Sequence, residues 1–392
     1  MDIHTKSVQV PDLAWPQNSA VPPLYQTAAY AYHGIEEADR IFRSEEPGYT
    51  YTRGGNPTTN ALACLIADLE EAPAGVIAAS GMGAVAAAIL ALQPTPAPIY
   101  VAREIYGGTV GLARRILEPL GFAFTWIDTH SIDQVEHALA AGGPGVVVLE
   151  SMSNPLGRVC AVDEVIDRAH RVKGRVVVDN TFATPYHARP LSWGADLVVH
   201  SVTKFIGGHS DLILGAVVGT EERVQKASQV MDLVGMTPDP FASWLAFRGA
   251  RTMALRMERA SANALGLAEA LRHVRGIDEV FYPGLATHPD HAQATRLLKN
   301  GYGAILAIRV ARGRAGADRL ARSLRLVPFV PSLGDVMTTI SHPVVASHRD
   351  LTPDEQAAVL IDAGVLRISV GIENVGDLIE DFKQAAAEVD HA

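Results

Sequence analysis

The chain of 392 residues is 48% hydrophobic and 19% charged, which is typical of a globular protein with a large core of two or three domains. Its formal net charge of −10 at pH 7 argues against nucleic acid or an anionic membrane as a general partner. The two cysteines, Cys64 and Cys160, have neither metal-ligand nor redox spacing. The N-terminus lacks an apolar signal segment, and no apolar window is long enough to span a bilayer. We therefore expect a reduced, cytoplasmic protein without a metal site.

Residues 1–54 are predicted to form an extended N-terminal arm, because they show little periodicity. Prolines at positions 11, 16, 22 and 23 favour extended backbone in this segment. The segment also carries aromatic side chains that need a surface to pack on, namely Tyr25, Tyr30, Tyr32 and Phe42. We expect the arm to contact a neighbouring subunit. The alternative is an arm that folds back on its own domain.

Residues 55–252 are predicted to form a large α/β domain. Apolar patterns predict helices over 58–71, 84–92, 109–117 and 162–172, and strands over 75–79, 98–102, 122–127, 146–150, 176–179 and 196–200. Because the strands are continuously apolar and alternate with helices, the pattern indicates a mostly parallel sheet covered on both faces. The polar residues that follow the strands should meet at the carboxyl edge of this sheet: Ser80, Glu150, Asp179 and Ser201.

Residues 253–392 are predicted to form a smaller C-terminal α+β domain. A long helical pattern opens it, and the later strands 303–310 and 365–372 alternate in polarity. The second of these strands has one apolar face and one face that carries Arg367, Ser369 and Gly371. This alternation predicts an antiparallel sheet with its polar face exposed.

A turn that holds Gly81, Met82 and Gly83 lies between a predicted strand and a predicted helix. Free backbone N–H groups at the start of a helix bind anions, and glycine lets the backbone approach a phosphate closely. The turn also fits the dinucleotide pattern G-x-G-x-x-A, and Glu104 follows Gly83 by 104 − 83 = 21 residues. A nicotinamide-dependent enzyme is therefore one alternative, and simple packing of helix on strand is another.

Lys204 follows the apolar strand 197–199 and precedes a Gly-Gly turn. Asp179 ends the preceding strand, 204 − 179 = 25 residues earlier. A pyridoxal phosphate site needs this pair, because a lysine condenses with the aldehyde while a carboxylate keeps the ring nitrogen protonated. The alternative is an ordinary surface lysine.

A second glycine-rich turn holds Tyr51 and Arg53. An arginine in such a turn can bind a phosphate through two parallel hydrogen bonds. The alternative is a purely structural turn. Taken together, the turns and the lysine–carboxylate pair predict a site for a phosphorylated cofactor.

Seven segments, in order across almost the whole chain, resemble the trans-sulfuration, or Cys/Met-metabolism, family of pyridoxal-phosphate enzymes: Y-T-R-G-G-N-P-T, S-G-M-G-A, I-Y-G-G-T, V-V-V-D-N-T-F-A-T-P, G-A-D-L-V-V-H-S-V-T-K-F-I-G-G-H-S-D, V-P-S-L-G-D and L-R-I-S-V-G-I-E. The family includes cystathionine γ-synthase, cystathionine γ- and β-lyases, methionine γ-lyase and the O-acylhomoserine sulfhydrylases. The resemblance implies the fold-type I, aspartate-aminotransferase-like α/β fold with pyridoxal 5'-phosphate as cofactor. It also implies a homotetramer built from two active dimers.

The resemblance assigns roles to the residues around the cofactor. Lys204 would be the Schiff-base lysine and would shuttle a proton, Asp179 would hold the ring nitrogen, and Tyr106 would stack on the ring. The phosphate would be bound within the subunit by Gly81, Met82, Ser201 and Thr203. Tyr51 and Arg53 would reach the phosphate from the neighbouring subunit, and Tyr51 would also protonate the leaving group at Cγ.

The resemblance also assigns the substrate side. Arg367 would bind the α-carboxylate, helped by Asn154 and Ser332. Many methionine γ-lyases have cysteine where this chain has Gly108, and lyases of the group usually have glutamate where it has Met337. These departures argue against methionine and cystathionine, respectively, and a neutral Met337 also fits O-acylhomoserine or canavanine. The alternative is neutral variation at both positions.

The predicted reaction is a γ-elimination or γ-replacement on an L-amino acid with a leaving group at Cγ, of the methionine, cystathionine, O-acylhomoserine or canavanine type. Elimination gives 2-oxobutanoate and ammonia, whereas replacement gives a substituted homoserine or homocysteine product. The alternatives are a β-lyase of the same family, a nicotinamide-dependent enzyme and a catalytically silent regulatory relative.

Overall fold

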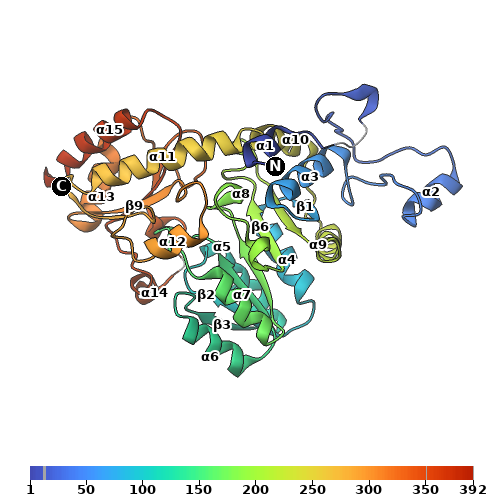
Figure 1. The fold of residues 1–392 in the computed structure, drawn as a ribbon, viewed down its shortest axis with the longest axis horizontal. Coiled ribbons are helices and arrows are strands. Elements are labelled where there is room, and N and C mark those ends of the chain that lie inside the picture. Colours follow the sequence, from blue (N-terminus) through green and yellow to red (C-terminus); the bar gives the residue numbers. More distant parts are fainter. Residues whose placement is uncertain (12–14, 350, 392) are drawn as a thin grey trace.

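The structure is a computed structural model that describes residues 1–11, 15–349 and 351–391. Figure 1 shows a large α/β part and a smaller C-terminal part, which the long helix α11 (Met253–Leu271) connects along one edge. A segment that includes the short helix α2 (Ile35–Phe42) projects from the large part. No helix among the described residues has the length and apolar character needed to cross a membrane.

A seven-stranded sheet in the order β1-β7-β6-β5-β4-β2-β3 forms the centre of the large part. Its strands are β1 (Ala74–Ala78), β2 (Pro98–Ala102), β3 (Ala123–Ile127), β4 (Val146–Glu150), β5 (Arg175–Asp179), β6 (Leu197–Ser201) and β7 (Gly215–Gly219). All six predicted strands are confirmed. The seventh, β7, was not predicted and is antiparallel to both of its neighbours, β1 and β6. Its glycine-rich sequence suits this place, because a Cβ at Gly215 would overlap the backbone carbonyl of Ser80.

Helices cover both faces of this sheet, as the apolar strands predict. They are α3 (Pro57–Glu70), α4 (Gly81–Leu92), α5 (Gly107–Leu112), α6 (Ile132–Gly142), α7 (Val162–Arg171), α8 (Thr184–His187), α9 (Glu221–Val234) and α10 (Pro240–Ala250). Along β5, Val176 and Val178 enter the core formed with α3 and α7, whereas Val177 enters the core formed with α4 and α9. Each fully buried valine contributes about 1.5–3 kcal/mol by leaving water.

The C-terminal part is built on a four-stranded antiparallel sheet in the order β10-β11-β9-β8. Its strands are β8 (Ile277–Phe281), β9 (Ile305–Val310), β10 (Thr339–Ser341) and β11 (Val365–Ser369), and its helices after α11 are α12 (His291–Leu297), α13 (Gly313–Ser323), α14 (Pro353–Ala358) and α15 (Val375–Ala387). The predicted helix and both predicted strands are confirmed.

The prediction that the polar face of residues 365–372 is exposed is wrong, because every residue of β11 is buried. The segment from Ser332 to Met337 covers this face. The N–H of Gly334 donates to the hydroxyl of Ser369 at 2.9 Å, and a Cβ at Gly371 would overlap the carbonyl of Val336. The polar side chains of β11 are therefore inside the molecule, where they need partners.

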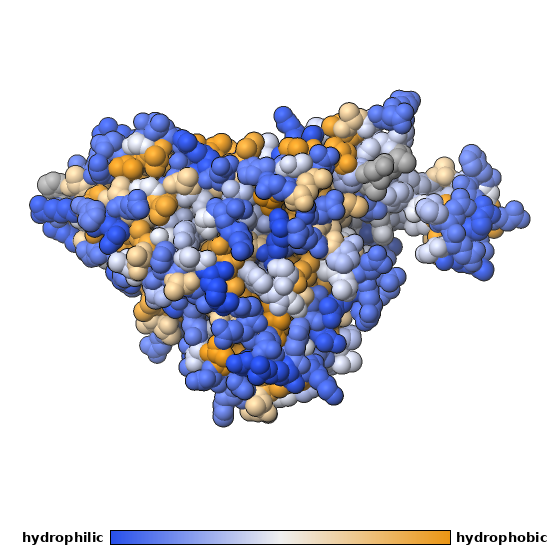
Figure 2. Space-filling view, in the orientation of Figure 1, coloured by the Kyte–Doolittle hydropathy of each residue, from blue (hydrophilic) through white to orange (hydrophobic). Residues whose placement is uncertain are grey.

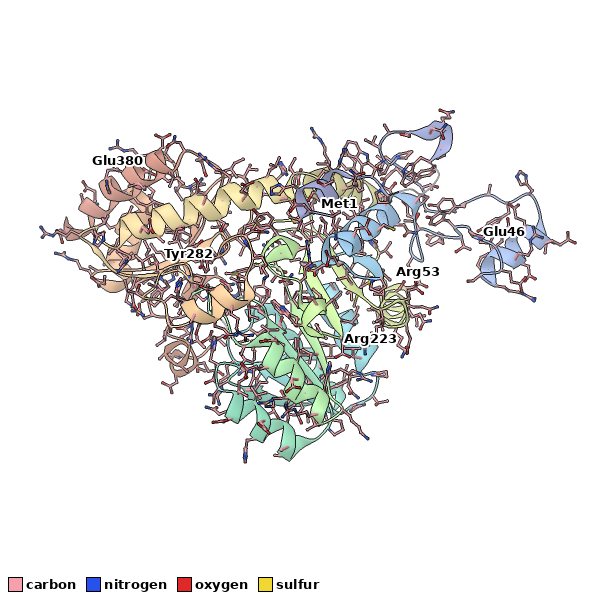
Figure 3. The ribbon with its side chains drawn as sticks, viewed as in Figure 1. Met1, Glu46, Arg53, Arg223, Tyr282 and Glu380 are labelled. Carbon is pink, nitrogen blue, oxygen red and sulfur yellow. The ribbon has the colours of Figure 1, made fainter. Side chains whose placement is uncertain are left out.

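The first 54 residues are divided between the body and the projecting segment. Helix α1 (Ile3–Val8) packs on α3 and α11 of the same chain through the buried Ile3. Figure 3 shows Glu46 on the projecting segment and Arg53 where this segment meets the body. Ile35 and Phe42 of α2 are exposed. In Figure 2, apolar residues also gather along the upper edge of the molecule near α11.

Candidate active site

A cavity of about 580 Å³ lies where the carboxyl ends of β4, β5 and β6 face loops of the C-terminal part. It is lined by residues from both parts of the chain. From the large part they include Ser80, Gly81, Met82, Tyr106, Glu150, Asn154, Asp179, Ser201, Thr203 and Lys204, and from the C-terminal part Ser332, Ser347, Arg349 and Arg367. Most of the predicted site residues are therefore brought together here. A cavity of this size at the carboxyl edge of such a sheet is the usual place for a cofactor and its substrate.

One end of the cavity is suited to a phosphate. Ser80 caps α4 by accepting a hydrogen bond from the N–H of Gly83 at 3.0 Å, which leaves the N–H groups of Gly81 and Met82 without helical acceptors. A Cβ at Gly81 would lie 2.8 Å from the Cβ of Ser201, so glycine is required for the turn to approach β6. The hydroxyl of Thr203 donates to the carbonyl of Leu214 at 3.1 Å.

Asp179 is held rigidly by Thr181, two residues further along the chain. Its Oδ1 accepts from the N–H of Thr181 at 3.0 Å and from the hydroxyl at 2.5 Å. The same hydroxyl accepts from the N–H of Ser201 at 2.8 Å, which ties the ends of β5 and β6 together. Burial raises the pKa of the Asp179 carboxyl despite these donors. A cationic partner at Asp179 would relieve this cost of burying its charge.

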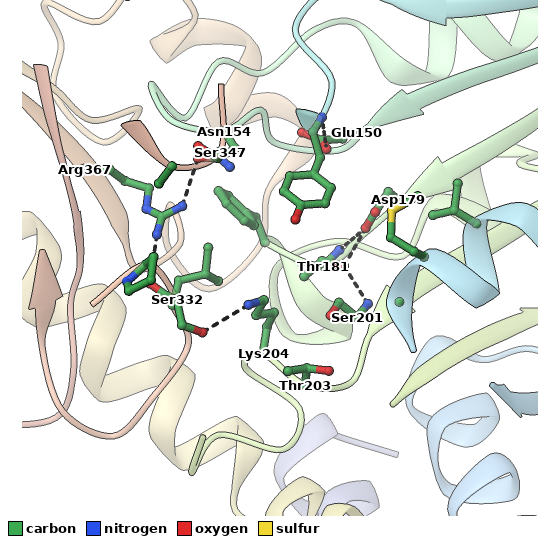
Figure 4. A pocket seen from close by; sticks show the side chains of 18 of the residues that line it. Glu150, Asn154, Asp179, Thr181, Ser201, Thr203, Lys204, Ser332, Ser347 and Arg367 are labelled. Atoms are coloured by element: carbon green, nitrogen blue, oxygen red, sulfur yellow. Dashed lines mark hydrogen bonds between the residues drawn. The ribbon is translucent and has the colours of Figure 1, made fainter. Parts of the chain in front are cut away.

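Lys204 and Arg367 are joined through one residue, Ser332. Nζ of Lys204 donates to the Ser332 hydroxyl at 3.1 Å, and Nη2 of Arg367 donates to the Ser332 carbonyl at 2.8 Å. Figure 4 shows these three side by side, with Asp179 across the cavity. Burial, together with the charge of Arg367, lowers the pKa of Lys204 to about 8. A substantial fraction of its amine is therefore unprotonated, and nucleophilic, near neutral pH.

Arg367 has hydrogen-bonding capacity that the described residues do not use. It is only 4% exposed, and Nη1 donates to Oδ1 of Asn154 at 3.2 Å. Nε is buried and has no hydrogen-bond partner in the described part of the chain. Burial lowers the pKa of Arg367 to about 10, so it remains charged at neutral pH. A buried guanidinium that forms no ion pair with a described carboxylate is suited to an anionic ligand.

Tyr106 projects into the same cavity from the start of α5. Its N–H donates to Oε1 of Glu150 at 2.9 Å, and its side chain is 41% exposed. Gly108 lies beneath the ring, because a Cβ there would overlap Cε1 of Tyr106 and lie 3.0 Å from Sδ of Met82. The absence of a side chain at this position therefore allows the present orientation of the tyrosine ring.

These features match the chemistry of pyridoxal phosphate. The free N–H groups of Gly81 and Met82, with the hydroxyl of Ser201, suit its phosphate. The buried carboxylate of Asp179 suits its ring nitrogen, and the amine of Lys204 suits its aldehyde. The glycine at position 81 lets the backbone of this turn approach Ser201 closely, so that the two lie together at this end of the cavity.

Other predicted site residues do not line the cavity of this single chain. Tyr51 is 48% exposed and its ring lies under the guanidinium of Arg53 at 5.3 Å. Arg53 pairs with Asp232 at 2.8 Å. Gly108 only touches residues that line the cavity, and Met337 is 44% exposed and outside its lining.

Sequence reasoning missed several residues of the site. Thr181 could have been found, because a threonine two residues after a strand-ending aspartate commonly bonds back to it. Ser347 and Arg349 come from a loop with no motif, and nothing in the sequence connects them with Lys204. The roles of Ser332 as a bridge and of Glu150 as an acceptor for Tyr106 are visible only in the structure.

Glu104 is not free to bind a ribose. Its carboxylate accepts from Arg158 at 3.3 Å and from the hydroxyl of Ser153 at 3.1 Å, and it lies 3.3 Å from Nε2 of His130. Arg158 and His130 also pair with Asp290 of the C-terminal part. The residue that suggested a nicotinamide site thus belongs to an ionic cluster that links the two parts of the chain.

Comparison with known proteins decides between these cofactors. A family described as "Cys/Met metabolism PLP-dependent enzyme" matches residues 4–387. The chain belongs to this family. It is a pyridoxal-phosphate-dependent enzyme, and the nicotinamide alternative is therefore wrong.

Individual relatives cover nearly the whole chain. An L-methionine gamma-lyase of Fusobacterium nucleatum subsp. polymorphum is 38% identical over 370 residues, 94% of this chain and 93% of that protein. An O-succinylhomoserine sulfhydrylase of Pseudomonas aeruginosa is 34% identical over 385 residues, 98% and 94% of the two chains. The crystal structure of cystathionine gamma synthase from Xanthomonas oryzae pv. oryzae, in complex with aminoacrylate and cysteine, has a TM-score of 0.93 at 35% identity and covers 100% of this chain and 99% of its own.

Proposed function

We propose that this protein catalyses elimination or replacement at Cγ of an L-amino acid, with Lys204 as its central catalytic residue. The observation that carries the proposal is the chain of hydrogen bonds that joins Lys204, Ser332 and Arg367 in one cavity, opposite Asp179. These hydrogen bonds hold an amine that can act as a base and a guanidinium that can bind a carboxylate at the same cavity. The family relatives act on amino acids that match this arrangement.

When bound, pyridoxal phosphate supplies an electrophilic aldehyde and a ring that accepts the electron pair left at Cα. Gly81, Met82 and Ser201 would hold the phosphate, and Thr203 would join them if its hydroxyl turned from the carbonyl of Leu214 toward the cavity. Asp179 would keep a proton on the ring nitrogen, and Tyr106 would stack on the ring. Arg367, with Asn154 and Ser332, binds the substrate α-carboxylate and so orients Cα. These residues position the reacting atoms before any proton moves.

Lys204 moves protons between the carbon atoms of the substrate. Its Nζ, with a pKa lowered to about 8 by burial and by Arg367, is basic enough to accept the Cα proton and acidic enough to return it. Loss of a group from Cγ further requires removal of a proton from Cβ, which the same mobile amine can perform. Release of the leaving group requires an acid at Cγ, and we assign this role to Tyr51.

Tyr51 and Arg53 reach the site from a neighbouring subunit in this proposal. Arg53 lies at the base of the projecting segment (Figure 3), and neither residue lines the cavity of its own chain. Residues 1–54 would then act as an arm between subunits, 55–252 as the cofactor domain and 253–392 as the C-terminal domain. The enzyme would be a cytoplasmic homotetramer of two active dimers.

The test is a panel of methionine, cystathionine, O-acetyl- and O-succinylhomoserine, cysteine and canavanine, with and without an added thiol. We expect 2-oxobutanoate from elimination or a substituted product from replacement. Pyruvate alone would indicate a β-lyase. If the enzyme exchanges the α-proton of none of these amino acids, the proposal is refuted and the protein is a catalytically silent relative.

Variants test the two central residues. Borohydride should fix the cofactor to the wild-type chain and to Lys226→Ala, an exposed control on α9, but not to Lys204→Ala. Covalent attachment of the cofactor to Lys204→Ala after borohydride treatment would refute the lysine assignment. Arg367→Ala should weaken amino-acid binding far more than cofactor binding, and equal losses would contradict its role.

A further inference from the structure

Arg349 is a second arginine in the lining of the active-site cavity. Unlike Arg367, it is exposed, so it lies at the open side of the cavity. Arg349 makes no hydrogen bond or ion pair with any other described residue. Neither the motifs of the sequence nor the proposed reaction gives this side chain a role.

The loop that carries Arg349 is fixed against the site. A Cβ at Gly107 would overlap the carbonyl of Ser347, so this loop packs directly on the turn that follows Tyr106. The neighbouring His348 is 2% exposed. Its N–H donates to the carbonyl of Pro343 at 2.9 Å, and its Nδ1 lies 2.8 Å from the hydroxyl of Ser347. The backbone of Arg349 therefore has a defined position at the cavity.

Among the described residues that line the cavity, none provides a counter-ion for Arg349. The acidic residues of the lining are Asp179 and Glu150. Glu150 accepts from the N–H of Tyr106 at 2.9 Å, and burial together with the charge of Asp179 raises the pKa of its carboxyl well above the usual range, which disfavours its charged form. In the proposed function Asp179 matches the ring nitrogen and Arg367 matches the α-carboxylate. The lining thus has one cation more than the cofactor and a simple amino acid require.

We propose that Arg349 binds a second carboxylate, carried at the far end of the γ-substituent of the substrate. This inference rests on the proposed function and names its substrate class: amino acids whose leaving group ends in an anion, as in O-succinylhomoserine. A guanidinium forms paired hydrogen bonds with a carboxylate. A cationic leaving group such as that of canavanine would meet repulsion, and a short neutral one would leave Arg349 solvated.

The kinetic test compares O-succinylhomoserine with O-acetylhomoserine, which lacks only the distal carboxylate arm. We expect wild-type kcat/KM to favour the succinyl ester, and Arg349→Ala to reduce it about 10-fold, mainly through KM, with less than about a 2-fold change for the acetyl ester. Arg349→Lys should retain part of the preference. Arg322→Ala, an exposed arginine of α13, is the control and should change neither ester. The same succinyl-to-acetyl ratio in wild type and Arg349→Ala would overturn the inference.

Equilibrium binding separates the inference from the proposed function. L-2-aminosuberate and L-2-aminooctanoate have the same chain length, differ by a distal carboxylate and carry no leaving group at Cγ. Calorimetry should show that the wild-type holoenzyme binds L-2-aminosuberate about 10-fold more tightly than L-2-aminooctanoate. Arg349→Ala should bind the two ligands equally, and its affinity for pyridoxal phosphate should be unchanged. If Arg349→Ala bound pyridoxal phosphate more weakly and lost affinity for both amino acids equally, the inference would be overturned and Arg349 would be assigned to the cofactor phosphate. Turnover of the acetyl ester without discrimination would refute only the inference, whereas no turnover of any panel compound would refute the proposed function.

Discussion

Two glycines of the same short helix provide a matched test of the active-site geometry. Gly108 and Gly111 both lie in α5. A Cβ at Gly111 would meet nothing within 4 Å, whereas one at Gly108 would overlap the ring of Tyr106 and approach Sδ of Met82 to 3.0 Å. Gly108→Ala and Gly111→Ala therefore change the helix backbone equally, but only the first should move the tyrosine.

The sizes of the two effects follow from this difference. Replacing a helical glycine by alanine stabilises a protein by about 0.4–1 kcal/mol through the unfolded chain, and Gly111→Ala should show this gain. In Gly108→Ala the ring of Tyr106 must leave its rotamer, at a cost of about 0.5–1.5 kcal/mol, so the net stability should be close to that of wild type. A displaced ring also loses stacking worth about 0.5–1.5 kcal/mol, which corresponds to a roughly 2- to 12-fold weaker affinity for pyridoxal phosphate.

The assay is a titration of each apo-enzyme with pyridoxal phosphate, followed by absorbance, together with urea denaturation of the apo-proteins. We expect weaker cofactor binding in Gly108→Ala only, and added stability in Gly111→Ala only. Equal cofactor affinities in the two variants would refute the placement of Tyr106 over the cofactor ring.

Three further outcomes follow from other residues. Because burial and Arg367 lower the Lys204 pKa to about 8, the rate at which the apo-enzyme takes up cofactor should rise with pH and level off above about 8, and a rate independent of pH between 6 and 9 would contradict this. Burial lowers the pKa of His130, but the hydrogen bonds to Asp290 and Glu104 outweigh burial and raise this pKa to about 9. In the unfolded chain the pKa is about 6.5. The free energy of unfolding that this ionic cluster contributes is therefore fully present below about pH 6.5 and is lost as the pH rises through about 9. Urea denaturation across that range should show the loss in wild type and a flatter profile in His130→Gln. Arg256 donates to the carbonyls of Phe205 at 2.6 Å, Ile206 at 3.0 Å and Gly249 at 2.8 Å. Arg256→Met should leave these buried acceptors unsatisfied and lower the free energy of unfolding by about 2–3 kcal/mol in urea denaturation. The exposed control Arg322→Ala should stay within about 0.5 kcal/mol of wild type.

The elements of the fold were largely predictable because their signals are local. Apolar strands of about five residues between amphipathic helices specify a covered parallel sheet, and all six strands predicted for it are present. Strand β7 was missed, because glycine at both of its ends weakens the apolar signal and its antiparallel place depends on the neighbours β1 and β6. The exposure of β11 was wrongly predicted for a related reason. Alternating polarity shows that a strand has two different faces, but it does not show what covers the polar one.

The sequence by itself determined the residues of the proposed cofactor side of the cavity: the glycine turn before α4, Asp179 at the end of one strand and Lys204 after the next. These residues lie at strand ends of a parallel sheet, where the order of elements already places them at one edge. The resemblance to the family named Arg367, Asn154 and Ser332 for the proposed substrate side, but only the tertiary structure decided how these residues meet and added Arg349 to them. Arg367 meets Lys204 through Ser332, and Arg349 reaches the cavity, only because the C-terminal part folds back over that edge. Contacts between segments more than 100 residues apart leave no periodicity in the sequence, so their partners are set by packing rather than by local pattern.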